Sequence, residues 1–233
     1  MIDFEQLKNV GNDPLYGSHM LCDGWTIWAG DKFKGIIAQC QQRLNVALTF
    51  CHKYECAVDV GACYGLYSYY LSHRFGKVYA FEPFVKNVEA IKANLHLFSS
   101  ASRFVLEPYG LSDKEEGMQI ITGPEGGLTT YYKDEGVCQF RTLDSLNLNP
   151  DFLKIDAEGM DLKVLKGAEE TLKRSKPVIM IEDTRTNTKK ERAKREHSEW
   201  YEEGQIPEYL QTFGYLPRAK IGIDWVYSVE PSK

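Results

Sequence analysis

The sequence lacks several features that define large classes of protein. None of its six cysteines forms a C-x-x-C pair, so neither a zinc knuckle nor a thioredoxin-type redox site is indicated. No apolar run approaches the roughly 20 residues that cross a bilayer. Asp3 and Glu5 lie where a signal peptide would be basic. We therefore expect a reduced, cytoplasmic protein without a membrane span.

Positive charge is also scarce, and no internal repeat or low-complexity segment is present. The formal net charge of −5 argues against a general polyanion binder, so nucleic acid is not an expected partner. With 233 residues, 43% of them hydrophobic, the chain can form one large α/β domain but hardly two full ones.

Short apolar runs alternate with segments of helical periodicity along most of the chain. This alternation predicts a doubly wound, mostly parallel sheet of the α/β class with seven strands. The last segment, 213–229, predicts an antiparallel hairpin at the sheet edge. The expected parallel strands are 55–61, 77–83, 103–112, 151–159 and 176–183, and the expected helices are 33–54, 65–75, 86–98, 161–175 and 207–215.

Two regions depart from this rhythm. We expect residues 1–50 to form a hairpin and a helix that cover the active-site side of a catalytic domain at 51–233. The polar segment 184–207 carries Lys and Arg at 185, 189, 190, 192, 194 and 195. It is either a solvated helix or loop, or a lid-like insertion that turns positive charge toward an anionic acceptor.

A glycine turn follows the first buried strand. "GACYG", from Gly61 to Gly65, is not the G-x-G-x-x-G turn of dinucleotide-binding proteins. Asp59 lies just before it, a poor neighbour for a pyrophosphate but a good one for the cationic amino acid part of S-adenosylmethionine. Glu82 ends the next strand, about 20 residues on, where an acid can accept hydrogen bonds from a ribose. We expect Gly61 to let the backbone approach this ligand, so that a larger residue there would block binding without unfolding the protein.

Five segments carry a resemblance to a known family: "VDVGACYGLYS", "VYAFEPFVKNVEAIKANL", "RTLDSL", "FLKIDAEGMDLKVLKGAEETL" and "PVIMIE". Together, from about Cys56 to Glu182, they resemble the FkbM-like family of S-adenosylmethionine-dependent methyltransferases. The resemblance implies a Rossmann-like class I methyltransferase fold and O-methylation of a hydroxyl on a small molecule, sugar or glycan. The family usually has Asn where this chain has Cys63, and Glu where it has Asp161, which we expect at a surface or structural position.

The resemblance also assigns roles to residues. It places the cofactor loop at the glycine turn, the ribose at the following acid, adenine beside two further segments, and the reacting centre at the end of the fourth strand. The residues are Asp59, Gly61, Ala62 and Gly65 for the turn, Glu82 for the ribose, Pro83, Phe84, Leu111 and Ser112 for adenine, and Asp156 for the centre. Lys154 points to the same side as Asp156, and we expect it to form an ion pair there.

If the acceptor is a hydroxyl, a base must take its proton. Asp156 and Glu158 lie at one strand end, and Glu182 lies at the neighbouring one. Asp183 and His197 are weaker candidates. No metal is expected, although Asp156 with Glu182 or Asp183 would offer oxygen ligands to Mg²⁺.

Other functions remain open from the sequence alone. An N- or nucleic-acid methyltransferase is disfavoured because the fourth strand lacks an Asp/Asn-Pro-Pro-aromatic motif. A NAD-dependent oxidoreductase is disfavoured by the G-x-x-x-G turn. A non-catalytic binding module is disfavoured because the acids Asp59, Glu82 and Asp156 are all present. The acceptor, and whether the chain forms a homodimer, are left open.

Overall fold

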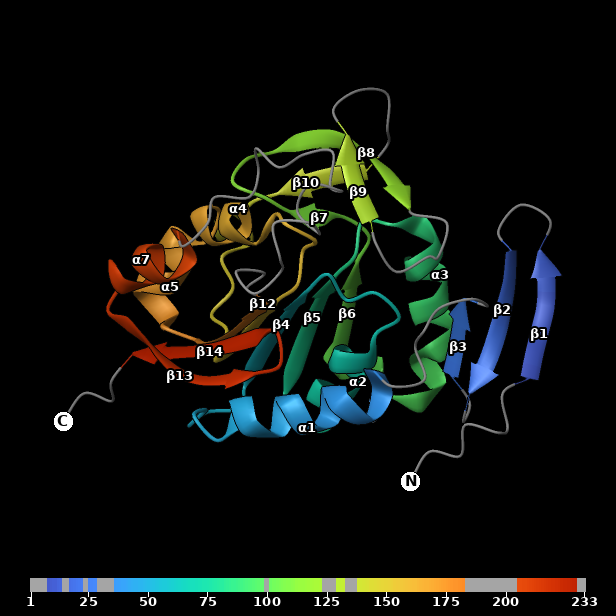
Figure 1. Ribbon diagram of the computed structural model, residues 1–233, viewed down its shortest axis with the longest axis horizontal. Helices are drawn as coiled ribbons and strands as arrows, with labels where there is room; N and C mark the ends of the chain where they lie inside the picture. Colours follow the sequence, from blue (N-terminus) through green and yellow to red (C-terminus); the bar gives the residue numbers. More distant parts are fainter. Residues whose placement is uncertain are drawn as a thin grey trace.

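Seven strands form the central sheet of the computed structural model (Figure 1). The structure describes residues 8–13, 17–22, 25–28, 36–98, 101–122, 129–132, 138–182 and 205–229. The parallel strands are β4 (Cys56–Val60), β5 (Lys77–Phe81), β6 (Phe104–Glu107), β11 (Phe152–Ile155) and β12 (Val178–Glu182), and the hairpin strands are β13 (Tyr215–Ile221) and β14 (Asp224–Val229). Their order is β13-β14-β12-β11-β4-β5-β6, which confirms the doubly wound, mostly parallel sheet.

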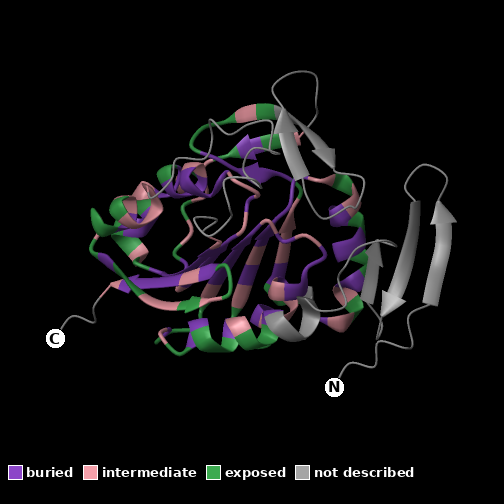
Figure 2. Ribbon diagram, in the orientation of Figure 1, coloured by how far each residue is buried: buried purple, intermediate pink, exposed green. Residues whose placement is uncertain are grey.

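Helices cover both faces of this sheet, so its central strands are buried on both sides, as the continuous apolar runs predicted (Figure 2). Leu44, Leu71 and Ile91 pack against one face, and Leu165, Leu172 and Leu210 pack against the other. The first face carries α1 (Ile36–Leu48), α2 (Leu66–Ser72) and α3 (Val85–Asn94). The second carries α4 (Asp161–Lys166), α5 (Glu169–Ser175) and α7 (Gln205–Gln211). Short 3₁₀ turns lie at Leu95–Leu97, Ala101–Arg103 and Asp144–Leu146.

Two predicted elements are each divided in the structure. The strand expected at 103–112 ends at Glu107 and resumes as β7 (Gly110–Leu111), with Pro108, which has no N–H to donate, in between. The helix expected at 161–175 is two helices. Between them lies Gly167, where an added Cβ would lie 2.0 Å from the carbonyl oxygen of Ser112. α4 and α5 are therefore separated at Gly167, where the backbone after β7 approaches the chain.

A second sheet holds β7 together with β8 (Glu116–Thr122), β9 (Thr129–Tyr132) and β10 (Cys138–Arg141), in the order β7-β10-β8-β9. This is the excursion that interrupts the alternation of strands and helices in the sequence. It lies at the top of the view in Figure 1, above the carboxyl ends of the parallel strands.

The hairpin at the sheet edge is confirmed. β14 pairs antiparallel with both β13 and β12, and Glu182 lies opposite Asp224 in this register. Because β14 runs against its neighbour, its first residue lies at the edge where the parallel strands end. The hairpin therefore adds a carboxylate to that edge.

The N-terminal strands β1 (Lys8–Asp13), β2 (Gly17–Cys22) and β3 (Trp25–Trp28) form a separate antiparallel sheet. That residues 1–50 cover the active-site side stays a prediction. The lid-like role of 184–207 also stays a prediction, because residues 183–204 lie outside the described residues. Two candidate site residues, Asp183 and His197, fall in that range.

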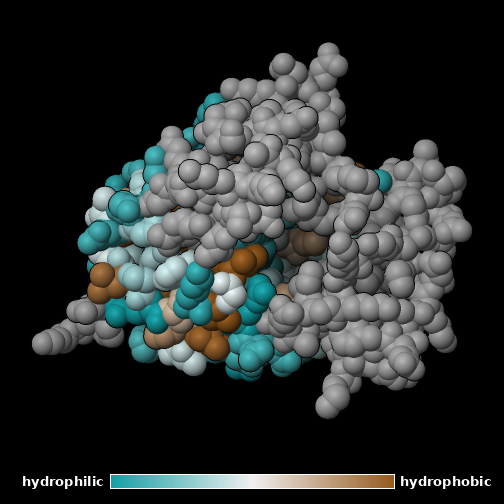
Figure 3. Space-filling model, viewed as in Figure 1, coloured by the Kyte–Doolittle hydropathy of each residue, from teal (hydrophilic) through white to brown (hydrophobic). Residues whose placement is uncertain are grey.

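On the face drawn in Figure 3, the described surface is mostly hydrophilic, with several apolar patches. Its exposed large apolar side chains are scattered and need no special role: Val46, Tyr54, Val85, Leu216 and Ile223. None of the helices in the described ranges has both the length and the apolar character needed to cross a membrane.

Candidate functional site

The glycine turn after β4 is held by the neighbouring strand. The N–H groups of Gly61 and Ala62 both donate to the carbonyl of Phe81, at 3.0 and 3.1 Å. Gly61 has φ +74°, and an added Cβ would lie 1.9 Å from the Asp156 carbonyl oxygen. The expectation that a side chain at Gly61 would enter the space of a ligand is therefore wrong, because the backbone after β11 occupies that space.

Gly65 closes the turn and begins α2. Its φ of +84° lies in the left-handed region that favours glycine. An added Cβ would meet the side chains of Phe98 and Ile91 at 3.3–3.4 Å. Both glycines of the motif are thus explained by backbone conformation and by packing inside the protein.

Glu82 lies at the carboxyl end of β5 and is held by the backbone on two sides. Its Oε2 accepts the N–H of Cys63 at 2.8 Å, and its Oε1 accepts the N–H of Phe84 at 2.9 Å. Burial raises the pKa of Glu82 to about 7, against the lowering effect of these bonds and of Asn87. Cys63 has φ +52°, which Asn tolerates better than most residues, so the family's usual Asn suits this position.

Asp59 is fully buried below the turn. Its Oδ2 accepts the hydroxyl of Ser68 at 2.6 Å, and its Oδ1 lies 3.5 Å from Nζ of Lys154. The expected ion pair of Lys154 is thus present, and it joins two acids, because Nζ also lies 3.5 Å from Oδ2 of Asp156. The cation beside Asp59 in the structure is Lys154; contact of Asp59 with a cofactor stays a prediction.

Asp156 and Glu182 lie next to each other at the ends of β11 and β12. A hydrogen bond joins the two side chains. Burial and the adjacent Asp156 raise the pKa of Glu182 to about 10. Burial also acts to raise the pKa of Asp156, but Lys154 and the bond from Glu182 outweigh it and hold that pKa below its ordinary value. Asp156 is thus ionised and one-third exposed, while Glu182 carries a proton.

Three residues that the sequence did not single out complete this edge. Asp224 of β14 lies opposite Glu182 and accepts Nη1 of Arg43 at 2.9 Å. Arg43 comes from α1, and the ring of Tyr67 from α2 lies 4.7 Å from Nζ of Lys154. Helical periodicity places Arg43 and Tyr67 on helices but gives no sign of their partners, which are distant in sequence.

The turn after β11 contains the other predicted acids. Glu158 has φ +50° and lies within electrostatic range of Glu182. Asp161 is buried, and its carboxylate accepts the N–H groups of Ala157 and Gly159 at 2.9 and 3.1 Å. Of the two expectations for Asp161, the structural one is confirmed: it fixes the turn that carries Glu158.

The residues expected beside adenine lie at the same end of the sheet. Pro83 is buried and its carbonyl accepts Sγ of Cys138 at 3.1 Å, whereas Phe84 is half-buried. Leu111 and Ser112 are both buried, and the Ser112 N–H donates to the Arg141 carbonyl in the second sheet. Their contact with a ligand stays a prediction.

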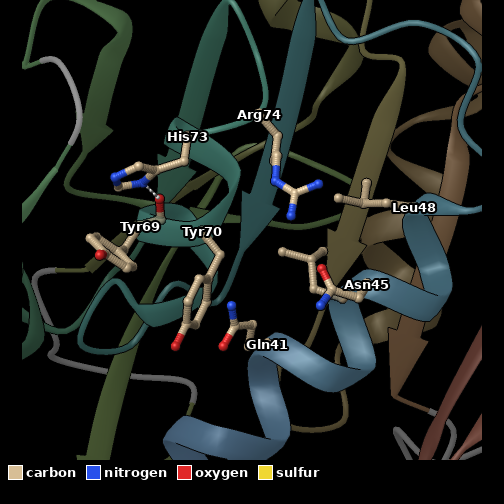
Figure 4. A pocket seen from close by; sticks show the side chains of 8 residues that line it. Gln41, Asn45, Leu48, Tyr69, Tyr70, His73 and Arg74 are labelled. Atoms are coloured by element: carbon tan, nitrogen blue, oxygen red, sulfur yellow. Dashed lines mark hydrogen bonds between the residues drawn. The ribbon is translucent and has the colours of Figure 1, made fainter. Parts of the chain in front are cut away.

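A pocket of about 220 Å³ lies elsewhere, between α1 and α2 (Figure 4). It contains none of the predicted site residues. Its α2 wall is the end of that helix remote from the glycine turn. The lining residues are Gln41, Leu44, Asn45, Leu48, Tyr69, Tyr70, His73 and Arg74. The candidate site is therefore the carboxyl edge of the sheet, where the carboxylates gather, and not this pocket.

In the part of the chain that the structure describes, no three His, Cys, Asp or Glu side chains are grouped so as to hold an ion. Asp183, one of the three acids considered for Mg²⁺, lies outside the described residues.

A doubly wound sheet with an antiparallel hairpin at one edge, a glycine turn after the first strand and an acid after the second has the architecture of a class I methyltransferase domain. The model of the methyltransferase FkbM domain matches residues 59–217. The chain therefore belongs to the FkbM methyltransferase family. No curated protein matches it.

Several solved structures have a similar backbone. A methyltransferase FkbM from Methylobacillus flagellatus KT is 20% identical, with 75% of this chain and 43% of that one covered, at a TM-score of 0.49. The chain thus spans less than half of that protein. A precorrin-6y C5,15-methyltransferase from Geobacter metallireducens GS-15 is 18% identical, with 82% and 88% covered, at 0.47. An rRNA methylase from Streptococcus thermophilus is 12% identical, with 82% and 95% covered, at 0.46. This level of likeness carries no information on the acceptor.

Proposed function

We propose that the protein transfers a methyl group from S-adenosylmethionine to a hydroxyl oxygen of a small molecule, sugar or glycan. The observation that carries the proposal is the pair of adjacent carboxyls, Asp156 and Glu182, at the end of the sheet and close to the glycine turn, with Lys154 beside Asp156. Family membership supports methyl transfer. A hydroxyl acceptor needs a base to take its proton, and the methyl donor does not provide one. The carboxylate of Asp156 can act as this base.

Glu82 fits the ribose of the cofactor. Each of its two carboxylate oxygens accepts one backbone N–H, and a carboxylate has about four acceptor sites in all. The Asn87 side chain uses a third site, so capacity remains for one ribose hydroxyl. Beside it, Oδ1 of Asn87 is buried without a hydrogen-bond partner among the described atoms, so a further acceptor is available to a ligand.

S-adenosylmethionine, when bound, supplies a methyl group on a positively charged sulfur. The chain's own contribution is to orient the acceptor and remove its proton. Asp156 is the group for this step because it is ionised, one-third exposed, and fixed from below by Lys154. The proton of the acceptor hydroxyl passes to Asp156 as the oxygen gains the methyl group, which leaves a neutral thioether, S-adenosylhomocysteine. Glu158 reaches the same edge and is the second candidate.

The acceptor is proposed to carry phosphate or carboxylate groups, on the grounds of the basic run at 185–195 and the proposed lid at 184–207. The net charge of −5 weighs against nucleic acid. A cytoplasmic location and a reaction without metal belong to the same proposal.

The proposal is tested in two steps. Calorimetry with S-adenosylmethionine and S-adenosylhomocysteine should show binding of both. Transfer of labelled methyl from S-adenosylmethionine should then be followed over a panel of sugars, nucleotide sugars and phenols, with matched amines alongside. Label on hydroxyl acceptors supports the proposal, and label on amines alone would overturn its oxygen specificity.

A further inference from the structure

We propose that Lys154 is a positioning residue that decides which of two hydrogen-bonded carboxyls, Asp156 or Glu182, is the base. This inference rests on the proposed function for its catalytic meaning. The arrangement of charge that it describes can be measured without any acceptor.

Strand register places the three side chains together. Lys154 pairs with Asp59 across β11 and β4, and Ile155 pairs with Ile181 across β11 and β12. The next residues along those strands are Asp156 and Glu182, which therefore stand side by side. Residues two apart on a strand point to the same face of the sheet. Lys154 and Asp156 therefore lie on one face, with Lys154 farther from the carboxyl end of β11.

The ammonium group of Lys154 is enclosed by acceptors. Nζ lies 3.5 Å from Oδ2 of Asp156, 3.5 Å from Oδ1 of Asp59 and 3.5 Å from the carbonyl oxygen of Gly61. Its side chain is only 3% exposed. A buried cation requires compensating charge, and here the charge comes from two carboxylates and an aromatic face. Among the described residues, Oδ1 of Asp59 has no hydrogen-bond partner, and the ammonium group of Lys154 compensates its charge.

Two carboxyls in contact cannot both ionise at neutral pH without a large cost, so the pair holds one proton. Lys154 breaks the symmetry between them because its ion pairs are with Asp156 and Asp59, and not with Glu182. The proton therefore resides on Glu182, which donates its hydrogen bond to Asp156. An ionised base beside a neutral donor is the result.

Other charged and titratable groups face this cluster, and they do not reverse the assignment. The Arg43–Asp224 ion pair on the far side largely cancels within itself. The acids near Glu182 disfavour its ionisation further. The groups are Asp59 from β4, Cys40 and Arg43 from α1, Tyr67 from α2, Asp224 from β14, and Glu158 and Asp161 from the turn after β11.

The test compares Lys154→Met, which removes the charge, with Lys154→Arg, which keeps it. Carbon-13 NMR of the side-chain carboxyls gives the protonation state of each acid, with Asp156→Asn and Glu182→Gln used for assignment. We expect Asp156 ionised and Glu182 protonated in the wild type at pH 7. Lys154→Met should raise the pKa of Asp156 by about 1–3, because a nearby opposite charge within 4–6 Å usually lowers a carboxyl pKa by that amount. Lys154→Arg should restore it.

A lysine at the other end of the sheet provides a matched control. Nζ of Lys77 donates to the Ser102 carbonyl at 3.2 Å, and Lys77→Met should leave the Asp156 titration unchanged. If Lys154→Met fails to fold because Asp59 is left unpaired, the double variant with Asp59→Asn removes that charge and serves in its place.

Lys154→Met should also move the acidic limb of the kcat/KM profile to higher pH by a similar amount, while activity recovers at high pH. An equal loss at every pH would mean that Lys154 only supports the fold. An unchanged Asp156 titration in Lys154→Met, or a wild type in which Glu182 is the ionised partner, would overturn the inference. If no hydroxyl is methylated but the NMR result holds, the proposed function fails and the assignment of the proton stands.

Discussion

The backbone N–H of Cys63 donates to Oε2 of Glu82 across 2.8 Å, so the glycine turn and the acid that ends the next strand form one unit. The turn positions the carboxylate, and the carboxylate fixes the turn. We expect Glu82→Ala to weaken S-adenosylmethionine binding by about 1.5–3 kcal/mol for each charge-assisted bond lost. Calorimetry measures this directly. Glu89→Ala, on the exposed side of α3, is the control, and equal affinities for both variants would remove Glu82 from the site.

Cofactor affinity should also depend on pH through the same residue. Burial raises the pKa of Glu82 to about 7 in the free protein, and the ionised form accepts a ribose hydroxyl in a stronger, charge-assisted hydrogen bond than the protonated form. Affinity is therefore expected to rise as the pH increases from about 6 to 8, with release of a proton on binding. Calorimetry in buffers of different ionisation enthalpy counts that proton. Binding with no proton release near pH 6.5 would contradict the assignment.

Gly61→Ala should destabilise the fold more than Gly214→Ala. Both glycines have positive φ, +74° and +82°, so each alanine carries the left-handed penalty of about 1–2 kcal/mol. Gly214 has nothing within 4 Å of an added Cβ, whereas Gly61 would place it 1.9 Å from the Asp156 carbonyl oxygen. Urea unfolding of the two variants separates conformational penalty from clash. Equal losses would show that the turn shifts away from β11 without cost.

Asp156→Asn preserves shape and removes the base. We expect kcat to fall by about 10²–10⁴, with S-adenosylmethionine binding retained. Glu182→Gln keeps a neutral donor to Asp156, so its loss of kcat should be much smaller. Single-turnover rates at saturating cofactor measure both. The opposite order, with Glu182→Gln the more damaged variant, would make Glu182 the base. A variant of Asp156 with normal kcat would instead direct attention to Glu158.

Stability should fall as the pH rises, because Glu182 keeps a proton in the folded protein. Its pKa is raised from 4.5 to about 10, so between those values the folded state binds more protons than the unfolded chain. The raised pKa values of Glu82, about 7, and Asp161, about 6, also lower stability as the pH rises. They do so only up to about pH 7 and pH 6. The lowered pKa of Asp156 matters only in acid, below its ordinary value of 3.8. Between about pH 7 and 8 the slope therefore reports mainly Glu182. At higher pH the buried thiols of Cys40, Cys51 and Cys56, whose pKa is raised from 9.0 to about 11, add to it.

Urea unfolding at pH 7.2 and pH 8.2, below the titration of the buried thiols, tests this dependence. Glu182→Gln should unfold with nearly the same free energy at both values, while the wild type loses stability. Glu115→Gln, an exposed carboxyl, should behave as the wild type does. Parallel slopes in the wild type and Glu182→Gln would mean that Glu182 is ionised in the folded protein.

The sequence by itself determined the sheet and the edge where its carboxylates gather. Apolar runs such as "CAVDV" and "VIMIE" are too continuous for half-exposed strands, and the helical spacing between them requires parallel crossover connections. Asp59, Glu82, Asp156 and Glu182 are found at strand ends because a polar residue is tolerated where a buried run stops. These are local patterns, and local patterns can be recognised in one dimension.

Only the tertiary structure decided which of these acids share a proton and which cation they face. Asp156 is beside Glu182, and Lys154 is beside Asp59, because of strand order and register, which no local period encodes. The pairing of Arg43 with Asp224 joins residues 181 positions apart. Gly61 and Gly167 are required by the close approach of backbone segments distant in sequence. Burial then sets the chemistry, since the same carboxyl side chains, freely exposed, would all be ionised at neutral pH.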